Sequence, residues 1–445
     1  MWYLPLLILV TTAAGAVGQQ PLTLSRAIQI ATERNPDVIA ARLEVERADA
    51  RVREAVGTAL PSVGFAANYS RHLQLPVFFL PDFRNPNSGQ VQAIRIGSEN
   101  SVQAQLQLTQ VLFNQAVLTG IGASQIYAQA ARMQYRATVA RTVATVKSAF
   151  YGALLARAAL EATRASLQRA ERFAQDVGVL ASQGLVADYD ALRARVQVEQ
   201  VRTLVSQAEL GYEAAVRQLK LVTGIPQESP VEIRGELEME FQPTRLPTPE
   251  EVLQQVLSRN PQLRVLELQE GVQRDIARIY RAESYPILVG FGTYTYQGQS
   301  PTFSNFLTAR SAAVGVQLSL SLFQGLQTTA RVEQAEIERQ KIQQQRERLR
   351  EAVKLQVLVA LEQQRLAQQR LEVARGVLTQ AERGYEIARI RYSSGLGTQL
   401  EVTDADAAIR QAQLTYAQAL HDYLVAQADL EYLTGSTDLS SIPQL

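Results

Sequence analysis

Four segments of the chain alternate apolar and polar residues with a period of two, the pattern of a β-strand with one apolar face. They lie at about residues 62–71, 101–112, 287–297 and 312–323. The third slips phase between Phe291 and Tyr294, which we interpret as a β-bulge. Strands of this length suit the wall of a membrane β-barrel, but a soluble antiparallel sheet with one buried face gives the same alternation. The pattern alone predicts strands and leaves their surroundings open.

Two much longer segments have the helical period instead. Residues 114–181 and 324–392 contain no proline, and each helix would be about 100 Å long at a rise of about 1.5 Å per residue. Helices of this length need partners along their length. Apolar residues recur at steps of three, four and seven at Val139, Val143, Val146, Phe150, Ala153, Leu160 and Leu167, and at Ala352, Leu355, Val359, Leu366 and Val373. This spacing predicts a coiled-coil seam on each helix.

Glycine turns repeat along the chain at a constant interval. The stretch "ASQGLVADYD" ends the first long helix at Gly184, and "YSSGLGTQLEVTDAD" ends the second at Gly395. These two glycines are 211 residues apart, and the same interval separates Gly224 from Gly435. The chain therefore contains an internal two-fold repeat.

Shorter helices complete each half. After each turn a return helix runs to about Leu221 or Leu433, and a leading helix precedes the first strand. The leading helix is broken at the "NP" dipeptides 35–36 and 260–261, where proline suits the first turn of a helix and the asparagine caps it. Return and leading helices together hold about seventy residues, enough to run beside one long helix. Each half is predicted to be a rod of antiparallel helical hairpins with a two-stranded cap.

The number of strands constrains how they enter a membrane. Four strands cannot close a membrane barrel, because the smallest single-chain barrels have about eight and open sheet edges are not tolerated in lipid. Several copies would have to contribute to one barrel. Within each half the strands are joined by loops, 73–100 and 298–310, which we expect to be irregular and to act as a recognition surface or as a spacer.

The amino-terminal segment has the pattern of an export signal. "MWYLPLLILVTTAAGAVGQQ" is a short apolar run followed by small residues, which predicts a signal peptide at 1–18 with cleavage near 16–18. No later segment approaches 18 uninterrupted apolar residues. An exported chain of this kind would enter a membrane as a β-barrel.

The amino-acid composition argues against several classes of function. The formal net charge of +1 gives no reason to expect a nucleic-acid partner, and cysteine is absent, which excludes disulfides and thiol chemistry. His72 and His421 stand in unrelated contexts, so we predict no metal site, no cofactor and no enzymatic activity. The expected organisation is a signal peptide (1–18), a first repeat (19–224), a linker or outer belt (225–248), a second repeat (249–435) and a tail (436–445).

Together these features resemble the TolC family of outer-membrane efflux proteins. The resemblance covers nearly the whole mature chain and rests on the "NP" breaks, the proline-led strands, the long helices, the glycine turns, and "TG" at 223 and 434. "GLVA" (184–187) and "YSSG" (392–395) are similar to family members at their periplasmic tips. The resemblance implies a mainly α fold with a small β part. In it a homotrimer forms a twelve-stranded β-barrel in the outer membrane and an α-barrel across the periplasm.

The same resemblance implies a function. It is that of a passive exit duct in a tripartite efflux or type I secretion system, gated at its periplasmic tip. A periplasmic adaptor protein and an inner-membrane transporter would be the partners. The cargo is not identified by the sequence. A trimeric coiled-coil adhesin without channel activity is the alternative, and it explains the helices but not the four strands.

Candidate gate residues follow the glycine turns. Glu401 and Asp404 are three apart on one helix, so both can face the same side, and trimerisation would create a ring of six carboxylates that binds cations. By resemblance these two residues occupy the acidic constriction, while Tyr392 and Asp190 match tip residues that hold the closed state by hydrogen bonding between helices. The family's usual arginine at the turn is replaced here by Gly397, and Arg193 or Arg391 is a candidate substitute.

Each assignment at the tips has a structural alternative. Acids in the first turn after a break also act as helix caps or favour the helix dipole, with Asp188 as an expected cap. The turn residues predicted to contact the adaptor are Gly184, Leu185, Val186, Gly395 and Leu396. Exposed leucines at a tip call for a partner, but packing on neighbouring subunits would explain them as well.

Overall fold

A computed structural model describes residues 21–81, 91–241 and 248–435, so the expected signal peptide and tail lie outside the described residues. The described chain is mainly helical with a smaller strand part. It divides into two compact units. The first holds residues up to 43, 132–264 and from 347 on, and the second holds 44–131 and 265–346. Each unit is described in turn.

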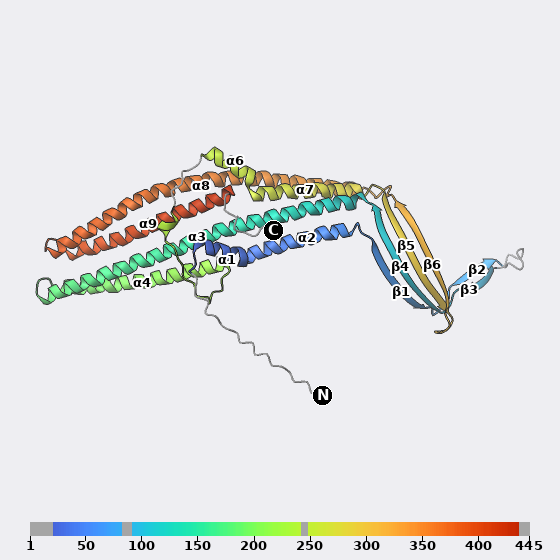
Figure 1. The fold of residues 1–445 in the computed structure, drawn as a ribbon, viewed down its shortest axis with the longest axis horizontal. Coiled ribbons are helices and arrows are strands. Elements are labelled where there is room, and N and C mark those ends of the chain that lie inside the picture. The colour runs from blue at the N-terminus through green and yellow to red at the C-terminus, as the bar shows by residue number, and fades with distance from the viewer. Residues whose placement is uncertain (1–20, 82–90, 242–247, 436–445) are drawn as a thin grey trace, which may run out of the picture. The chain divides into compact units, whose positions relative to one another are not determined.

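The helices repeat between the two halves of the sequence. The first half has α1 (Leu24–Arg34), α2 (Pro36–Gly57), α3 (Gln115–Ser182) and α4 (Asp188–Thr223). The second half has α6 (Pro249–Arg259), α7 (Pro261–Ala282), α8 (Gln327–Ser393) and α9 (Gln399–Thr434). The lengths are 11, 22, 68 and 36 residues in the first half and 11, 22, 67 and 36 in the second. Figure 1 shows α4 returning beside α3 and α9 returning beside α8.

One described helix, α3, contains a stretch apolar enough to cross a membrane by length and composition. This stretch includes polar residues, so it is not an uninterrupted apolar run. A single such helix is also typical of a packed core.

The breaks in the leading helices have the predicted geometry. The Asn35 side chain accepts hydrogen bonds from the backbone N–H groups of Asp37 (2.9 Å) and Val38 (3.3 Å). Asn260 does the same for the residues two and three positions after it, at 3.0 and 3.1 Å. Pro36 and Pro261 each take the first helical position, where no N–H donor is required. The prediction of asparagine caps is confirmed.

The return helices end in the same way in both halves. Gly224 and Gly435 adopt left-handed backbone conformations, with φ of 74° and 65°. Only Gly224 also closely approaches another element, because a Cβ atom added there would lie 2.6 Å from the Arg34 carbonyl oxygen at the end of α1. At Gly435 the nearest atom would be 3.8 Å away. The two halves therefore share a cap but differ in packing.

The core of the first unit confirms one predicted seam and corrects the other. In α3 the predicted positions Val139, Val143, Val146 and Phe150 are buried, and this helix packs with α9 through Leu420. In α8 the predicted seam is exposed at Leu355, Val359, Leu366 and Val373. The buried stripe lies one position away, at Val353, Val357, Ala360, Gln364, Ala367, Leu371 and Ala374. Its alanines and glutamine made it weaker in the sequence than the exposed stripe.

The segment between the halves is anchored rather than a simple linker over its described part. Leu22 forms a parallel bridge with Ile233, and the Leu22 N–H donates to the Glu232 carbonyl at 2.8 Å. The Arg157 guanidinium on α3 donates to the carbonyls of Ile233 and Gly235. A short helix, α5 (Leu237–Glu240), follows, and Leu237 is buried in the core.

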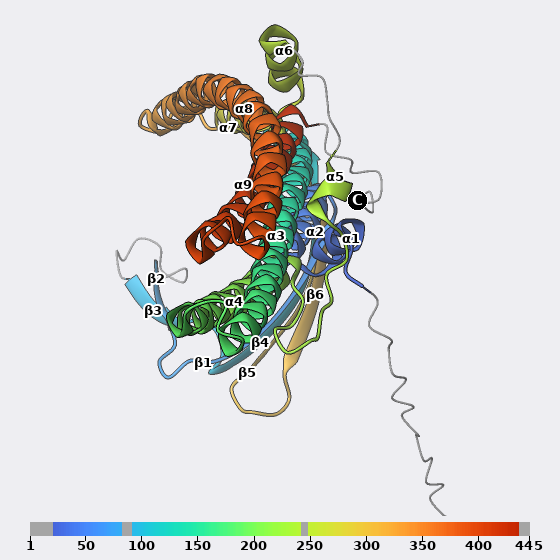
Figure 2. The ribbon, with the colours of Figure 1, turned by 90° about the vertical axis from the view of Figure 1, so that its left-hand side faces the viewer.

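The second unit contains a four-stranded antiparallel sheet. Its order is β1–β4–β5–β6, so β1 (Ser62–Arg71) and β6 (Leu307–Ser319) are the edges, with β4 (Asn100–Phe113) and β5 (Ile287–Ser300) between them. The last strand lies about five residues earlier than predicted, because β6 pairs in continuous register with β5 from Ser319 back to Leu307. Figure 2 shows these strands in a second orientation.

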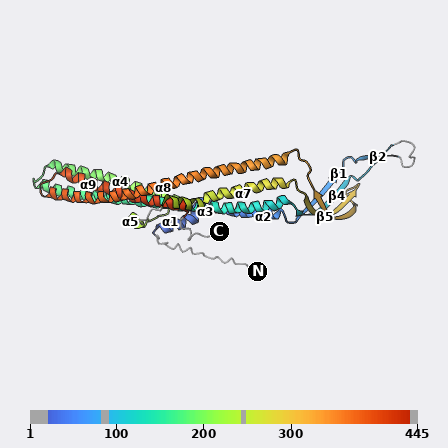
Figure 3. The same cartoon turned by 90° about the horizontal axis from the view of Figure 1, so that it is seen from above.

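The loop 73–100, expected to be irregular, contains a hairpin of its own. Strands β2 (Val77–Pro81) and β3 (Val91–Arg95) form a separate two-stranded sheet. Figure 3 shows β2 beyond the end of β1. Three prolines in this loop argued against strands, yet Pro81 is only the last residue of β2.

The bulge is also placed differently from the prediction. The register between β4 and β5 shifts between Val111 and Phe113, whereas pairing through Phe291 and Tyr294 is continuous. Phe291 therefore lies on the polar face of the sheet. It pairs with Gly315, where a Cβ atom would meet the Phe291 ring at 2.6 Å, so the aromatic ring covers a glycine of the neighbouring strand.

The register aligns the apolar positions of all four strands on one face. Phe65 pairs with Leu106, Leu106 with Tyr294, and Tyr294 with Ala312. The next row contains Val63, Leu108, Gly292 and Val314. The opposite face carries glutamines, threonines and serines. Val314 is 91% exposed, so this apolar face is uncovered in a single chain.

Candidate functional site

The two long helices end in matching turns within the first unit. Gly184 (φ 68°) and Gly395 (φ 71°) are both left-handed. In the first turn Gly184 N–H donates to the Ala181 carbonyl and the next N–H donates to the Leu180 carbonyl, both at 2.9 Å. The same pair of bonds recurs 211 residues later, at 3.0 and 2.9 Å. Both turns are Schellman motifs, which favour glycine at this position. The ends that carry them face the viewer in Figure 2.

The turn leucines are exposed. Leu185 is 67% exposed and Leu396 is 73% exposed, while Val186 is half-buried. A Cβ atom at Gly184 or Gly395 would meet nothing within 4 Å, so the backbone at both turns is also open. The predicted adaptor-contact residues thus form two accessible apolar tips.

Tyr392 and Asp190, predicted as a pair, lie close together. The Tyr392 ring packs on Phe173 of α3 with centroids 5.0 Å apart. Burial raises the pKa of the Tyr392 hydroxyl, and the charge of Asp190 raises it further. Among the described residues this buried hydroxyl has no hydrogen-bond partner. The Gln399 side chain of α9 donates to the Asp190 carbonyl at 3.1 Å and connects the two hairpins at this level.

Glu401 has a cationic neighbour from the preceding helix. The Arg391 guanidinium lies 3.6 Å from the Glu401 carboxylate and donates to the Leu396 carbonyl at 3.1 Å. Capping of α9 is supplied by Thr398, whose hydroxyl accepts from the Glu401 N–H at 3.3 Å. Because Thr398 caps the helix, the Glu401 carboxylate is free for another role. Of the two candidate arginines, Arg391 is the one beside this acid.

Gly397 lies in a tightly packed part of the turn. A Cβ atom there would lie 3.0 Å from the Arg391 Cβ and from the Tyr392 backbone nitrogen. Such contacts are tighter than most made by a real Cβ, so a side chain there would require the neighbouring atoms to shift by a few tenths of an ångström. The glycine and the inward-folded Arg391 are therefore parts of one local arrangement.

Two other predicted acids make few contacts in the chain. Asp404 is exposed. Asp188 does not cap α4, because the N-cap residue is Ala187 and no side chain caps the helix there. Asp188 and Asp190 lie instead in the first turn, where their charges favour the helix dipole. The capping prediction for Asp188 is wrong.

One connection between the hairpins was missed. Asp406 on α9 forms an ion pair with Arg169 on α3 and accepts a hydrogen bond from Ser166 of the same helix. Both charged side chains are mostly buried, and the Arg169 guanidinium also lies over the Tyr385 ring of α8, 5.6 Å from its centroid. Asp406 is two residues beyond Asp404, so it faces another side of the helix. The only signal for this ion pair in the sequence was the second acid of "TDAD", which is Asp406.

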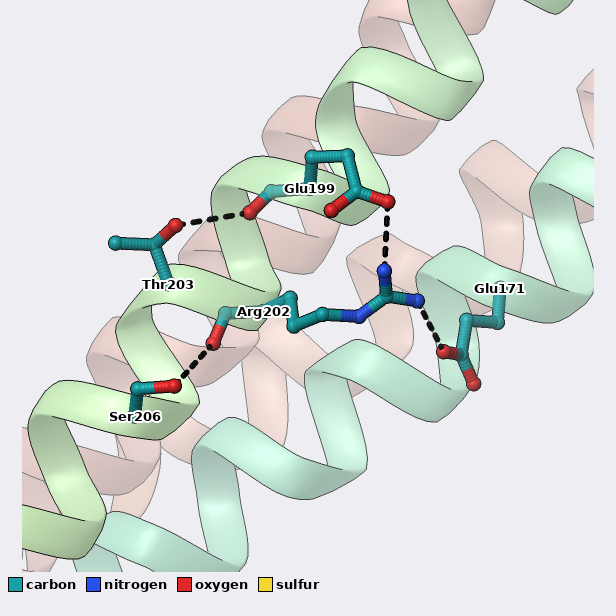
Figure 4. Close-up of polar contacts among 5 residues, drawn as sticks. All are labelled: Glu171, Glu199, Arg202, Thr203 and Ser206. Atoms are coloured by element: carbon teal, nitrogen blue, oxygen red, sulfur yellow. Dashed lines mark hydrogen bonds and ion pairs between the residues drawn. The ribbon is translucent and has the colours of Figure 1, made fainter.

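The first hairpin is held by ion pairs that the second cannot form. Arg202 on α4 bonds Glu199 of its own helix at 2.6 Å and Glu171 of α3 at 3.3 Å (Figure 4). A second pair, Arg164–Glu209, joins the same helices at 2.6 Å. The repeat-related residue of Arg202 is Gln413, and that of Glu209 is Leu420. Each exposed ion pair contributes about 0.2–1 kcal/mol to stability. The second hairpin therefore lacks this small contribution to holding its two helices together.

A groove opens between α8 and α9. It has a volume of about 680 Å³ and is lined by Val373, Val377, Leu414, Ala419, Gln411 and Arg370, among others. Val373 also belongs to the exposed stripe of α8. An apolar groove of this size between two helices can hold a helix of another chain.

Comparison with known proteins agrees with this architecture. The chain is 22% identical to the outer membrane protein TolC of Salmonella enteritidis over 442 residues, covering 97% of this chain and 86% of TolC. It is 25% identical to protein CyaE of Bordetella pertussis over 342 residues, covering 74% and 70% of the two chains.

Solved structures show the same fold. The Campylobacter jejuni CmeC outer membrane channel superposes with a TM-score of 0.74 at 17% identity, covering 93% of this chain and 85% of CmeC. The open state of the Neisseria gonorrhoeae MtrE outer membrane channel gives 0.72 at 19% identity, covering 93% and 88%. The sequence model of the outer membrane efflux protein family matches residues 27–225 and 252–436, which span both repeats. The chain therefore belongs to the outer membrane efflux protein family.

Proposed function

We propose that three copies of this chain form a channel that acts as the passive exit duct of a tripartite efflux or type I secretion system. The observation that carries this proposal is the sheet of the second unit. It has one apolar face, one polar face and two unpaired edge strands, β1 and β6. In a trimer, β6 of one copy would pair with β1 of the next and close a twelve-stranded barrel whose apolar face meets lipid.

The exposed stripe of α8 supports the same assembly. Leu355, Val359, Leu366 and Val373 follow a coiled-coil spacing but are exposed in a single chain, and Val373 is 67% exposed. A second copy packed on this stripe would bury it in knobs-into-holes contacts. Repeated around three copies, such contacts would join the hairpins into an α-barrel.

Family membership indicates an outer-membrane location with a large periplasmic part. In the proposed channel the hairpin turns would be the periplasmic tips. The exposed tips at Leu185 and Leu396 are then the surfaces for a periplasmic adaptor protein, which in turn binds an inner-membrane transporter. The role is conduction rather than catalysis.

We propose that the gate is formed where α9 begins. Glu401 and Asp404 would line the constriction, with Tyr392 and Asp190 holding the closed state through the contacts between hairpins. Arg391 beside Glu401 offsets part of the acidic charge in each copy. The second hairpin is the better candidate for movement, because it lacks the ion pairs of Arg202 and Arg164.

The channel is tested by mass and conductance of the same sample. Protein extracted from outer membranes in detergent should have the mass of a trimer and should conduct ions across a planar lipid bilayer. A trimer that inserts but carries no current would favour the alternative, an exported coiled-coil adhesin. A monomer that stays in solution without detergent would refute both the barrel and the duct.

A further inference from the structure

Two arginines stand among the apolar residues of the sheet. Counting by alternate residues along β1, the apolar face runs through Val63, Phe65 and Tyr69 to Arg71, the last residue of the strand. Along β6 it runs from Leu318 through Val314 to Arg310. Each edge strand therefore has one arginine on its apolar face, eight residues beyond the apolar residue at the other end. Both side chains are exposed.

Each arginine has a tyrosine beside it. The Arg310 guanidinium lies over the Tyr296 ring of β5, 5.9 Å from its centroid, and these two residues are cross-strand partners. Arg71 follows Tyr69 on the same face, and the Tyr69 hydroxyl donates to Asn100 of β4 at 2.7 Å. Within the described ranges neither guanidinium has a carboxylate partner. Glu99 precedes the first residue of β4, and its backbone carbonyl accepts a hydrogen bond from the His72 N–H.

The position of the arginines along the strands corresponds to the edge of a membrane. Eight residues at about 3.4 Å span roughly 27 Å along a strand, or about 21 Å along the membrane normal at a tilt of about 40°. The apolar band of an outer-membrane barrel is about 25 Å tall and is bordered by aromatic residues. Arg71 and Arg310 therefore fall near its border, at the end of the sheet that leads into the β2–β3 hairpin and away from the helices (Figure 1).

We propose that Arg71 and Arg310, with Tyr69 and Tyr296, bind the phosphate-bearing headgroup of an outer-leaflet lipid. Guanidinium groups bind phosphate through paired N–H donors, and a tyrosine ring holds the guanidinium in place while meeting the acyl chains. This site rests on the proposed function, because it needs the apolar face to meet lipid. In the closed barrel β6 of one copy adjoins β1 of the next, so both arginines belong to the strands of one seam, and a trimer has three such seams.

The surroundings of the arginines favour a lipid over a soluble phosphorylated ligand or a second protein chain. A soluble phosphorylated ligand would need an enclosing pocket with several polar partners, whereas these arginines border an exposed apolar face. A second protein chain would more simply be matched by carboxylates. A lipid supplies both the acyl chains for the face and the phosphate for the guanidinium groups.

Native mass spectrometry of the trimer tests the proposal. The trimer is released from phosphatidylcholine vesicles that contain a minor fraction of diphosphorylated lipid A, and the lipid retained is counted. The unmodified trimer should retain up to three lipid A molecules, and Arg71→Gln/Arg310→Gln should retain roughly tenfold less, as expected for the loss of charge-assisted hydrogen bonds. Arg310→Lys keeps the charge without the planar fork and should be intermediate. Arg383→Gln on α8 removes one positive charge per chain away from the sheet and should retain lipid A normally.

The outcomes separate this proposal from the proposed channel. Conductance of the same double variant reports on the channel, and we expect it to be unchanged. If the conducting trimer retains lipid A equally in the double variant, the headgroup site is refuted while the channel stands. If excess inorganic phosphate displaces the bound species as well as lipid A does, the site is one for free phosphate and the lipid assignment is wrong. If the unmodified protein forms no trimer, the proposed function itself fails.

Discussion

Replacing Gly224 by alanine tests whether the two repeats, alike in sequence, differ in packing. Gly224 and Gly435 are related by the repeat, and both have left-handed backbones, with φ of 74° and 65°. An alanine in this conformation costs about 1–2 kcal/mol in either place. At Gly224 the new Cβ would also lie 2.6 Å from the Arg34 carbonyl oxygen and 2.8 Å from its carbon. These are backbone atoms, which cannot rotate away.

The added contact sets the size of the difference. Separating α4 from the end of α1 resembles overpacking of a core, which costs about 1–3 kcal/mol. It would also strain the hydrogen bond from the Asn35 side chain to the Val222 carbonyl, now 2.8 Å. We therefore expect Gly224→Ala to cost about 2–5 kcal/mol and Gly435→Ala about 1–2 kcal/mol in free energy of unfolding. At Gly435 the nearest atom to the new Cβ is 3.8 Å away.

Thermal unfolding followed by the helical circular dichroism signal gives the comparison in one detergent. Gly211→Ala is the matched control, since Gly211 lies inside α4 and a Cβ atom added there would meet nothing within 4 Å. Alanine there should stabilise by about 0.5–1 kcal/mol through higher helix propensity. The expected order of melting temperature, from highest to lowest, is Gly211→Ala, unmodified, Gly435→Ala, Gly224→Ala. If Gly224→Ala melts no lower than Gly435→Ala, the close approach of α1 and α4 does not contribute to stability.

Three further perturbations address the gate, the core and the assembly. Glu401→Ala/Asp404→Ala should weaken cation selectivity and change conductance, whereas Glu33→Ala/Asp37→Ala on α1 and α2 should not; unchanged selectivity in the first variant removes the gate assignment. Burial raises the pKa of the Glu240 carboxyl above its ordinary 4.5, and the charge of Lys147 only partly opposes this rise. The neutral form of Glu240 therefore contributes stability below pH 4.5, and this contribution is lost as pH rises through the pKa of the folded state. Glu240→Gln should therefore unfold like the unmodified protein in acid and be more stable near neutrality, and a variant less stable at neutral pH would contradict this. In size-exclusion chromatography, Val373→Asp should abolish the expected trimer, whereas Val373→Leu should preserve it. If Val373→Asp still forms a stable trimer, the exposed α8 stripe is not an interface.

The parts of the fold that could be predicted are those fixed by local physics. The asparagine caps at 35 and 260 and the glycine turns at 184 and 395 depend on backbone groups within a few residues. Strand alternation likewise located β1 and β4. Repetition strengthened each inference, because a signal seen in one half recurred in the other.

The errors arise where distant residues decide the outcome. The α8 stripe that packs within the chain contains Gln364 and several alanines, so it has less apolar character than the stripe left exposed. Phe291 was assigned a bulge because it broke the alternation, yet its ring is accommodated by Gly315 of the next strand. Near the tips, Asp406 was overlooked because its partner, Arg169, is 237 residues away in sequence. Register and pairing between distant segments cannot be inferred from one local pattern.

The two unpaired edges of the sheet have a consequence for biogenesis. A single folded chain presents β1 and β6 with free backbone donors and acceptors, next to an apolar face. Such edges pair with whatever strand they meet, so a lone copy is prone to aggregate. In the proposed trimer, closure would remove every edge at once, and its rate would depend on the concentration of chains. The time before closure would therefore be when this protein is most vulnerable, and holdase chaperones that cover the edges would be needed most when few copies are present.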